Sequence, residues 1–524
     1  MHLAQYFVQA VKRFPEATAV VDDRVRWSYQ DLYEEVATVA ANVQQSDVKQ
    51  GDHVLVVLKN HRENLVIYWA CQLLGLIYTP VNFRMSLAEL VYCIGDAEPV
   101  FVFYEEENRV IIEAALKQTQ SSARAYAVGT SSGSDTFEKL RLRGASLQAV
   151  PPISDDAITI MLYTSGTTGR PKGVPRSHLN EASAAEAHII QNQYTLFEST
   201  IGVMPFYHTM GMRTLLVTTF LNGKLVLLPS HDKSGGYEPE AALELLAREE
   251  ITSLYLVPTL YYDLVSRPQL DQYDLQALTK IGYAGAAMTS TLTQACFERF
   301  RPKVFVNHFG SSEVYTFTIC SWLDRKPTCA GRPGFHEEVR IVTADPTRYV
   351  LPDEVVSTGT PGEVIVSLSS PEAFKGYWHR TDANEKALRQ GWYFSGDVGV
   401  WDEDGDLWVQ GRVDDMLISG GENIHPLEVE DVLAQHPKVA EVAVAGLPDE
   451  RWGQIVAAFV VPADASLTAE ELDQFALANS QLARFKRPRR YVFIKEVPKS
   501  AVGKILRRKL QAEEYELYDM PVQQ

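Results

Sequence analysis

Short apolar runs rich in strand-forming residues alternate with longer helical patterns between residues 53 and 285. A polar or glycine-containing break follows each run, which predicts buried strands, and helical stretches such as residues 241–250 lie between them. This alternation predicts a large α/β region of mostly parallel sheets flanked by helices, with ligands at the carboxyl ends of the strands. The predicted strands are residues 53–58, 99–104, 157–164, 224–229, 253–258 and 280–285.

The character of the chain changes after about residue 414. Shorter apolar runs occupy residues 439–448 and 455–462, and a helix is predicted over residues 467–485, opened by Thr468 as its cap. We therefore predict two domains. Residues 1–413 form the large N-terminal α/β domain, and residues 414–524 form a small α+β C-terminal domain.

Charge and composition exclude several classes of protein. The chain of 524 residues is 46% hydrophobic and has a net charge of −18, so a nucleic-acid partner is not expected and an anionic ligand needs a local basic region. No basic leader with a cleavage site and no apolar run of membrane-spanning length occurs, so we expect a cytoplasmic protein without a transmembrane segment. The cysteines lack metal-ligand spacing and are expected to be reduced core residues: Cys71, Cys93, Cys296, Cys320 and Cys329.

The stretch YTSGTTGRPKG, residues 163–173, follows directly on one predicted strand. Its glycines let backbone N–H groups approach an anion, and its hydroxyls and Lys172 add donors, so it suits a phosphate. It is not a P-loop, because Pro171 and Gly173 stand where that motif requires glycine and a hydroxyl residue. On these residues alone, a phosphate loop and an ordinary glycine-rich turn are both compatible with the stretch.

Six further stretches follow in order: PFYHTMG, YAGAAM, NHFGSSE, GWYFSGDVG, GRVDDMLISGGENIHPLEVE and PKSAVGKILRR. With the glycine-rich stretch they resemble the adenylate-forming superfamily of acyl-CoA synthetases, carrier-protein adenylation domains and luciferases, from about residue 10 to the C-terminus. Within it, GFHEEVRIV, DERWGQ and ARFKRPRRY look closest to the bacterial 4-chlorobenzoate and aromatic acid–CoA ligases.

The resemblance implies an ATP-dependent acid–CoA ligase that uses ATP, Mg²⁺ and coenzyme A. A carboxylate would attack the α-phosphorus, release pyrophosphate and give an acyl adenylate, from which the thiol displaces AMP. Such chemistry depends on positioning and charge neutralisation. The partners expected are therefore small molecules, and homodimer assembly is one compatible state.

The same resemblance assigns residues to these steps. Glu313 is similar to the Mg²⁺ carboxylate, Lys504 to the lysine that bridges carboxylate and α-phosphate, and Asp397 with Arg412 to the ribose-binding pair. The implied catalytic residues are Lys504, His208, Glu313 and Ser312. The implied nucleotide-binding residues are Thr164, Ser165, Gly166, Thr167, Thr168, Lys172, Gly285, Ala286, Ala287, His308, Phe309, Asp397 and Arg412. Phe309 departs from the usual tyrosine but can still stack on adenine.

The C-terminal domain is implied to be mobile and to provide the coenzyme A contacts. Residues 484–490 are strongly basic in an otherwise acidic chain, which suits phosphates. Asp414 matches the family hinge, which presents Lys504 for adenylation and a glycine-lined tunnel for thioester formation. The implied coenzyme A contacts are Gly420, Gly421, Trp452, Phe485, Arg487 and Arg489.

The acyl pocket is implied to be compact and partly polar. His308 and Tyr315 add hydrogen-bonding groups, which favours a hydroxylated or otherwise polar aromatic acid, such as a substituted benzoate or cinnamate. The residues implied to line the acyl pocket are Thr209, Met210, Tyr255, Ala284, Gly310, Tyr315 and Thr316. Alternatives are a short- or medium-chain fatty acyl-CoA synthetase, an enzyme that loads a carrier protein, and a non-catalytic nucleotide-binding protein.

Overall fold

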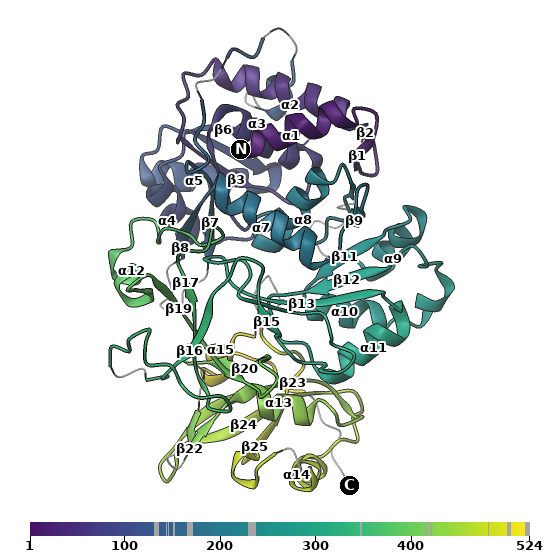
Figure 1. Cartoon of the computed structure of the whole chain (residues 1–524), viewed down its shortest axis with the longest axis vertical. Helices are drawn as coiled ribbons and strands as arrows, with labels where there is room; N and C mark the ends of the chain where they lie inside the picture. The colour runs from purple at the N-terminus through teal and green to yellow at the C-terminus, as the bar shows by residue number, and fades with distance from the viewer. Residues whose placement is uncertain are drawn as a thin grey trace.

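The computed structural model places the N-terminal elements at one end of the long axis and the C-terminal elements at the other (Figure 1). It describes residues 1–129, 136–142, 144, 146–149, 152–164, 171–228, 237–345, 348–413, 415, 417–419, 422–479, 482–499 and 505–518. No helix among these residues has the length and apolar character that crossing a membrane requires.

A six-stranded sheet contains three of the predicted strands. Its order is β6-β5-β3-β4-β7-β8, and neighbouring strands run parallel except β7 with β8. The strands are β3 (His53–Val57), β4 (Ile77–Pro80), β5 (Phe101–Glu105), β6 (Arg124–Val128), β7 (Ile158–Thr164) and β8 (Lys172–Ser177). The accompanying helices are α1 (Leu3–Arg13), α2 (Tyr29–Gln44), α3 (Arg62–Leu74), α4 (Leu87–Ala97), η1 (Glu106–Asn108), α5 (Arg109–Thr119) and α6 (Phe137–Leu140).

A nine-stranded sheet contains the other three predicted strands. Its order is β15-β14-β13-β12-β11-β9-β10-β1-β2, with a parallel centre from β13 to β1 and antiparallel edges. The strands are β1 (Thr18–Val21), β2 (Arg26–Ser28), β9 (Ser199–Ile201), β10 (Lys224–Val226), β11 (Ser253–Leu256), β12 (Lys280–Tyr283), β13 (Val304–Phe309), β14 (Thr318–Cys320) and β15 (Arg332–Pro333). Its helices are α7 (His178–Gln191), α8 (Thr209–Phe220), α9 (Pro239–Arg248), α10 (Pro258–Val265), η2 (Pro268–Gln272) and α11 (Ser290–Phe300).

One apolar core joins the two sheets. Phe7 of α1 stacks on Trp69 of α3 with ring centroids 4.5 Å apart, and residues from both sheets and from α7 and α8 surround them. The five cysteines are free and buried, as the sequence predicts. The mostly parallel α/β architecture is therefore confirmed.

A third sheet, fully antiparallel, was not predicted. It consists of β16 (Val339–Val342), β17 (Gly362–Ser367), β18 (Leu388–Arg389), β19 (Trp392–Trp401) and β20 (Leu407–Arg412), with α12 (Thr381–Ala387) beside it. Mixed burial along β19 and β20 gives no continuous apolar run, which explains why the pattern was missed.

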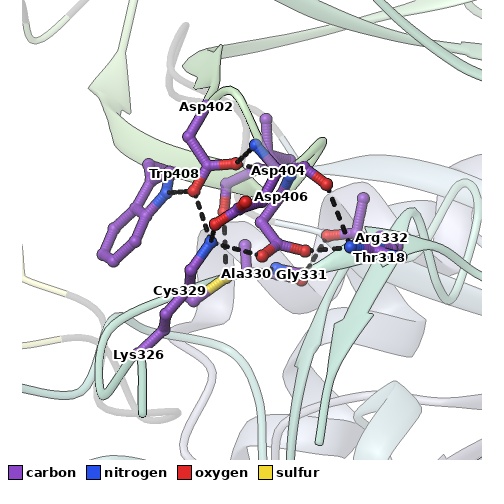
Figure 2. Close-up of polar contacts among 11 residues, drawn as sticks. Thr318, Lys326, Cys329, Ala330, Gly331, Arg332, Asp402, Asp404, Asp406 and Trp408 are labelled. Atoms are coloured by element: carbon purple, nitrogen blue, oxygen red, sulfur yellow. Dashed lines mark hydrogen bonds and ion pairs between the residues drawn. The ribbon is translucent and has the colours of Figure 1, made fainter. Parts of the chain in front are cut away.

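Ion pairs connect the β19–β20 turn to Lys326, in the segment between β14 and β15 of the nine-stranded sheet. Lys326 Nζ lies 2.7 Å from Asp402, 2.8 Å from Asp404 and 2.6 Å from Asp406, as Figure 2 shows. These carboxylates hold the pKa of Lys326 above its usual range. Arg332, in β15, also binds Asp406, so the turn carries two cross-links to the neighbouring sheet.

The C-terminal elements form a smaller α+β unit with its own apolar core. They are β21 (Leu417–Ser419), β22 (Glu422–Ile424), α13 (Pro426–Leu433), β23 (Val439–Asp449), β24 (Gly453–Pro462), α14 (Ala469–Ala478), η3 (Arg484–Lys486), β25 (Arg490–Phe493) and α15 (Arg507–Gln511). Thr468 caps α14 as predicted, by accepting from the Glu471 backbone N–H at 3.1 Å. The helix is shorter than predicted, because Asn479 leaves helical geometry with ψ near 120°.

Candidate active site

A cavity of about 1700 Å³ opens where the parallel strands of the nine-stranded sheet end. Tyr255, Tyr283 and Phe309 stand at or near the carboxyl ends of β11, β12 and β13 and line it. Asp397 and Arg412 of the antiparallel sheet line it as well. The cavity therefore occupies the edge at which open α/β sheets bind ligands.

Lys172 enters this cavity from the six-stranded sheet. It begins β8, directly opposite Thr164 at the end of β7. Its Nζ lies 4.1 Å from the centroid of the Tyr377 ring. Burial lowers the pKa of Lys172, while the carboxylate of Glu313 raises it. A lysine desolvated in this way interacts strongly with an incoming phosphate, because the local dielectric is low.

Glu313 presents a fixed carboxylate to the same cavity. Its side chain is buried, and the Tyr377 hydroxyl donates to Oε1 at 2.7 Å. The Arg176 guanidinium donates to the carbonyl oxygens of Ser312, at 3.1 Å, and Glu313, at 3.3 Å. Among the described residues nothing hydrogen-bonds to Oε2 of Glu313. A single available carboxylate oxygen beside a phosphate site fits Mg²⁺, which is held by one or two carboxylates together with substrate phosphates.

Asp397 and Arg412 face each other in the β19–β20 ladder. Arg412 Nη1 lies 2.9 Å from Asp397 Oδ1 and also donates to the Ser395 carbonyl at 3.0 Å. Gly396 lies between Ser395 and Asp397 in the chain and has φ +73. A Cβ at this position would sit 2.8 Å from Arg412 Nη2. The glycine therefore allows the guanidinium to pack against the strand, where it holds Asp397 in a fixed position.

The segment after β12 forms a smooth wall of the cavity. Gly285 has φ +84, a left-handed conformation that glycine adopts without strain, and Ala286 and Ala287 follow it. Phe309 lines the cavity too, and its ring meets Phe317 edge to face with centroids 5.1 Å apart. Small residues and a ring supported from behind suit a flat heterocycle such as adenine.

His208 is the N-cap residue of α8 and lines the cavity, as do the aromatic residues Tyr207 and Tyr255. Burial lowers the pKa of His208 to about 4, so the imidazole is neutral at pH 7. Its Nδ1 accepts from the Met210 backbone N–H at 3.4 Å. At Gly310 a Cβ would lie 2.1 Å from the Tyr315 carbonyl oxygen, so glycine is required for this close approach of backbone.

Comparison with known proteins identifies the chain. The AMP-binding enzyme model matches residues 7–378, and the model of the AMP-binding enzyme C-terminal domain matches residues 428–504. The chain belongs to the AMP-binding enzyme family. The expectation of an adenylate-forming enzyme is thereby confirmed.

Individual members of this family are similar to the chain over almost its whole length. A feruloyl-CoA synthase from Amycolatopsis sp is 32% identical, covering 96% of this chain and 97% of that protein. A long-chain-fatty-acid–CoA ligase from Bacillus subtilis is 30% identical, covering 98% and 95%. The crystal structure of ATP-bound MatB from Rhodopseudomonas palustris superposes with a TM-score of 0.86 at 28% identity, covering 98% and 99%.

The structure brings many of the predicted residues of this AMP-binding enzyme together in one cavity. They come from several elements spread from β7 to β20, and sequence alone does not make them neighbours. The predicted residues that line the cavity are Thr164, Lys172, His208, Thr209, Met210, Tyr255, Ala284, Gly285, Ala286, Ala287, His308, Phe309, Gly310, Ser312, Glu313, Tyr315, Asp397 and Arg412.

Other predicted residues lie elsewhere. Thr316 is fully buried and does not line the cavity; its hydroxyl accepts from Arg213 at 3.1 Å. Ser165, Gly166, Thr167, Thr168, Asp414, Gly420, Gly421 and Lys504 lie outside the described residues. Lys499 and Ile505, on either side of the segment that contains Lys504, line the cavity.

Four of the predicted coenzyme A contacts, Trp452, Phe485, Arg487 and Arg489, are among the described residues; they lie on the C-terminal unit and do not line the cavity. The guanidinium of Arg489 lies 4.4 Å from the Trp452 ring centroid, and that of Arg451 lies 4.9 Å from it. Phe485 is 46% exposed. Arg487 is paired with Asp473 at 2.5 Å, so a ligand phosphate would have to compete with that carboxylate.

The sequence-based assignment missed Tyr377 and Arg213. Tyr377 contacts both Lys172 and Glu313 from a segment without a distinctive motif. Arg213 lines the cavity and is buried. It is the single charged residue in the helix sequence TMGMRTLLVTTF, and a charge on a buried helix was the available signal.

Proposed function

We propose that this chain is an AMP-forming acid–CoA ligase that activates a small aromatic carboxylate bearing a polar substituent. The observation that carries the proposal is that Lys172, Glu313, Asp397 and Arg412 line the same cavity as the aromatic side chain of Tyr255. A cationic and acidic nucleotide end next to an aromatic acyl end is what an acyl adenylate requires.

In the first half-reaction the carboxylate oxygen attacks the α-phosphorus of ATP, and the bond to pyrophosphate breaks. Lys172 neutralises charge on the departing phosphates, and Asp397 accepts hydrogen bonds from the ribose hydroxyls. Glu313 would hold Mg²⁺, which supplies charge neutralisation to the phosphates. Lys504 is proposed to bridge the substrate carboxylate and the α-phosphate; the cavity-lining positions of Lys499 and Ile505 support this role.

In the second half-reaction the coenzyme A thiol attacks the acyl carbonyl, AMP leaves and a proton is released. We propose that the C-terminal residues from about 414 onward move as a unit about Asp414 between the two steps. Trp452 and Arg489 would then meet the nucleotide of coenzyme A, and Gly420 and Gly421 the pantetheine arm. The exposed cationic and aromatic pairing at Trp452 supports a phosphate-bearing, flat ligand there.

Pyrophosphate release with and without coenzyme A tests the proposal. The panel contains benzoates, hydroxybenzoates, cinnamates, short acids and medium-chain fatty acids, each with ATP and Mg²⁺. Turnover with aromatic acids that depends on coenzyme A supports the ligase. A strong preference for octanoate over all aromatic acids contradicts the substrate class, and release without an acyl-CoA product indicates a carrier-protein acceptor.

The cellular location and the oligomeric state of the protein are two further parts of the proposal. Five buried free cysteines fit a reducing compartment, so we propose a cytoplasmic location. Homodimer assembly stays a prediction, which light scattering on the purified protein tests.

A further inference from the structure

Two arginines lie against the ring of Tyr315 in the wall of the acyl pocket. The Arg176 guanidinium carbon lies 3.5 Å from the ring centroid, and that of Arg213 lies 4.8 Å from it. Arg176 is fully buried and pairs with Glu181 at 2.5 Å. Arg213 is also buried, but it lines the cavity and forms no ion pair with any carboxylate in the part of the chain that the structure describes.

The groups that Arg213 does contact are neutral acceptors. Its Nη1 donates to His188 Nδ1 at 3.2 Å and to the Thr316 hydroxyl at 3.1 Å. Because a guanidinium only donates, His188 Nδ1 must accept, and the imidazole proton sits on Nε2. Burial, His308 and Arg213 keep the pKa of His188 well below its usual value, so this histidine is neutral and adds no second positive charge beside Arg213.

The second histidine of the cluster is neutral as well. The Asn192 side-chain nitrogen donates to the His188 carbonyl at 2.8 Å, which fixes the amide orientation, and lies 2.9 Å from His308 Nε2. His308 Nε2 is therefore an acceptor. Burial, followed by the charge of Arg213, keeps the pKa of His308 well below its usual value. Arg213 is thus a buried cation whose hydrogen-bond partners are neutral.

Arg213 lines the cavity, so a ligand bound there can reach its guanidinium. His208 is the N-cap of α8, and Arg213 follows five residues later on the helix, about 7.5 Å further along its axis. Thr209 and Arg213 are one turn apart and both line the cavity. Nη2 and Nε of Arg213 make no hydrogen bond within the described chain. A buried guanidinium is costly unless it is paired, and here the cavity is the side from which a pairing group can come.

We propose that Arg213 is the receptor for a second anionic group on the substrate, so that the preferred acid is an aromatic dicarboxylate. One carboxylate reacts near His208, and the other binds Nη2 and Nε of Arg213 at the inner end of the pocket. This inference rests on the proposed ligase function and narrows its substrate class. Bidentate pairing with a guanidinium suits a carboxylate better than a phenol, which offers a single oxygen.

Matched acids test the inference on the unmodified enzyme. Benzene-1,4-dicarboxylate and benzene-1,3-dicarboxylate are each compared with their 4- and 3-carbamoylbenzoate counterparts, which have nearly the same shape and lack the second charge. We expect kcat/KM for the better dicarboxylate to exceed that of its carbamoyl partner by roughly a hundredfold, because a buried unpaired cation discriminates strongly. Equal or better turnover of the carbamoyl acids overturns the inference.

Variants of Arg213 locate the effect. Arg213→Met should lower kcat/KM for the dicarboxylate about tenfold more than for the carbamoyl acid, and Arg213→Lys should keep part of the preference because it keeps the charge without the fork. Equal losses for both acids would mean that Arg213 binds the reacting carboxylate or only supports the fold. The melting temperature of each variant shows whether it folds. If a variant does not fold, the comparison of dicarboxylates with carbamoylbenzoates on the wild-type enzyme still tests the inference.

The panel of the preceding section separates this inference from the ligase function. Coenzyme A-dependent turnover of other acids, with none for the dicarboxylates, leaves the ligase in place and overturns the second-anion proposal. No turnover of any acid overturns the ligase itself.

Discussion

At the scale of single residues, the cavity works through pairs in which one side chain fixes another. Arg412 holds Asp397, and Tyr377 lies between Lys172 and Glu313. Such partners orient charged groups before a substrate arrives, which lowers the reorganisation needed during reaction. The sequence motifs predicted the charged members of these pairs. Tyr377 could not be predicted, because a tyrosine in FKGYWH has no spacing that ties it to Glu313 and Lys172, which lie 64 and 205 positions earlier.

Tyr377→Phe tests the orienting role of this hydroxyl. The ring stays beside Lys172, but Glu313 loses the hydrogen bond to Oε1, so the carboxylate becomes more mobile. We expect the Mg²⁺ concentration for half-maximal pyrophosphate release to rise about tenfold, as loss of a ligand's supporting hydrogen bond usually does. Tyr349→Phe, at an exposed tyrosine, is the matched control and should leave the value unchanged. An unchanged Mg²⁺ requirement in the first variant would refute the role.

At the scale of elements, six strands of the two mostly parallel sheets were predictable, and the antiparallel sheet of β16 to β20 was not. β3, β5, β7 and β11 are short runs of buried apolar residues with breaks after them, so their pattern is visible in one sequence. β19 contains buried and half-exposed residues, so it forms no continuous apolar run. Its position in the sheet depends on its pairing with β17, β18 and β20. β18 and β20 are consecutive with β19 in the chain, but the pairing with β17 joins residues as far apart as Gly362 and Gly399 and leaves no local signature.

Two acidic residues, Glu337 before β16 and Glu372 after β17, lie close enough to affect each other's charge. Glu337 Oε1 accepts from Ser370 at 2.7 Å, and the carboxylate of Glu372 is fully buried nearby. Burial, and then the charge of Glu372, raise the pKa of Glu337 to about 8. The folded protein therefore favours the protonated form of Glu337.

Glu337→Gln tests this pair through the pH dependence of stability. A folded-state pKa raised above the unfolded value contributes stability below about pH 4.5, and this stability is lost as the pH rises through 8. The melting temperature of the wild type should therefore fall relative to that of Glu337→Gln as the pH rises from 4.5 to 8. Above pH 8 the difference between the two melting temperatures should stay constant. The neighbouring exposed Glu338→Gln is the control. A constant difference across this window would contradict the raised pKa of Glu337.

At the scale of the whole molecule, one cavity serves two units of the chain. Residues of the large unit line most of it, and Lys499, Ile505 and Arg507 line it from the C-terminal unit. Arg507 is anchored within that unit by Glu430 at 2.6 Å. Trp452, Phe485, Arg487 and Arg489 do not line the cavity, so the proposed thioester formation requires the C-terminal unit to change its position.

Asp414→Pro tests that movement. Proline fixes φ and resists the backbone rotation that a hinge needs. We expect thioester formation to slow about tenfold or more while adenylation, followed by pyrophosphate release in a single turnover, changes little. Ala465→Pro, at an exposed position between β24 and α14, is a control for the general effect of proline. Equal losses in both half-reactions would contradict the hinge.

The most direct test of the central claim, that one site carries out both half-reactions, is a single-turnover chase. Enzyme, ATP, Mg²⁺ and an accepted acid are mixed without coenzyme A and quenched, and a second sample receives coenzyme A before the quench. The account predicts stoichiometric enzyme-bound acyl adenylate in the first sample and its conversion to acyl-CoA and AMP in the second. Formation of ADP, or of acyl-CoA without a preceding acyl adenylate, would contradict it.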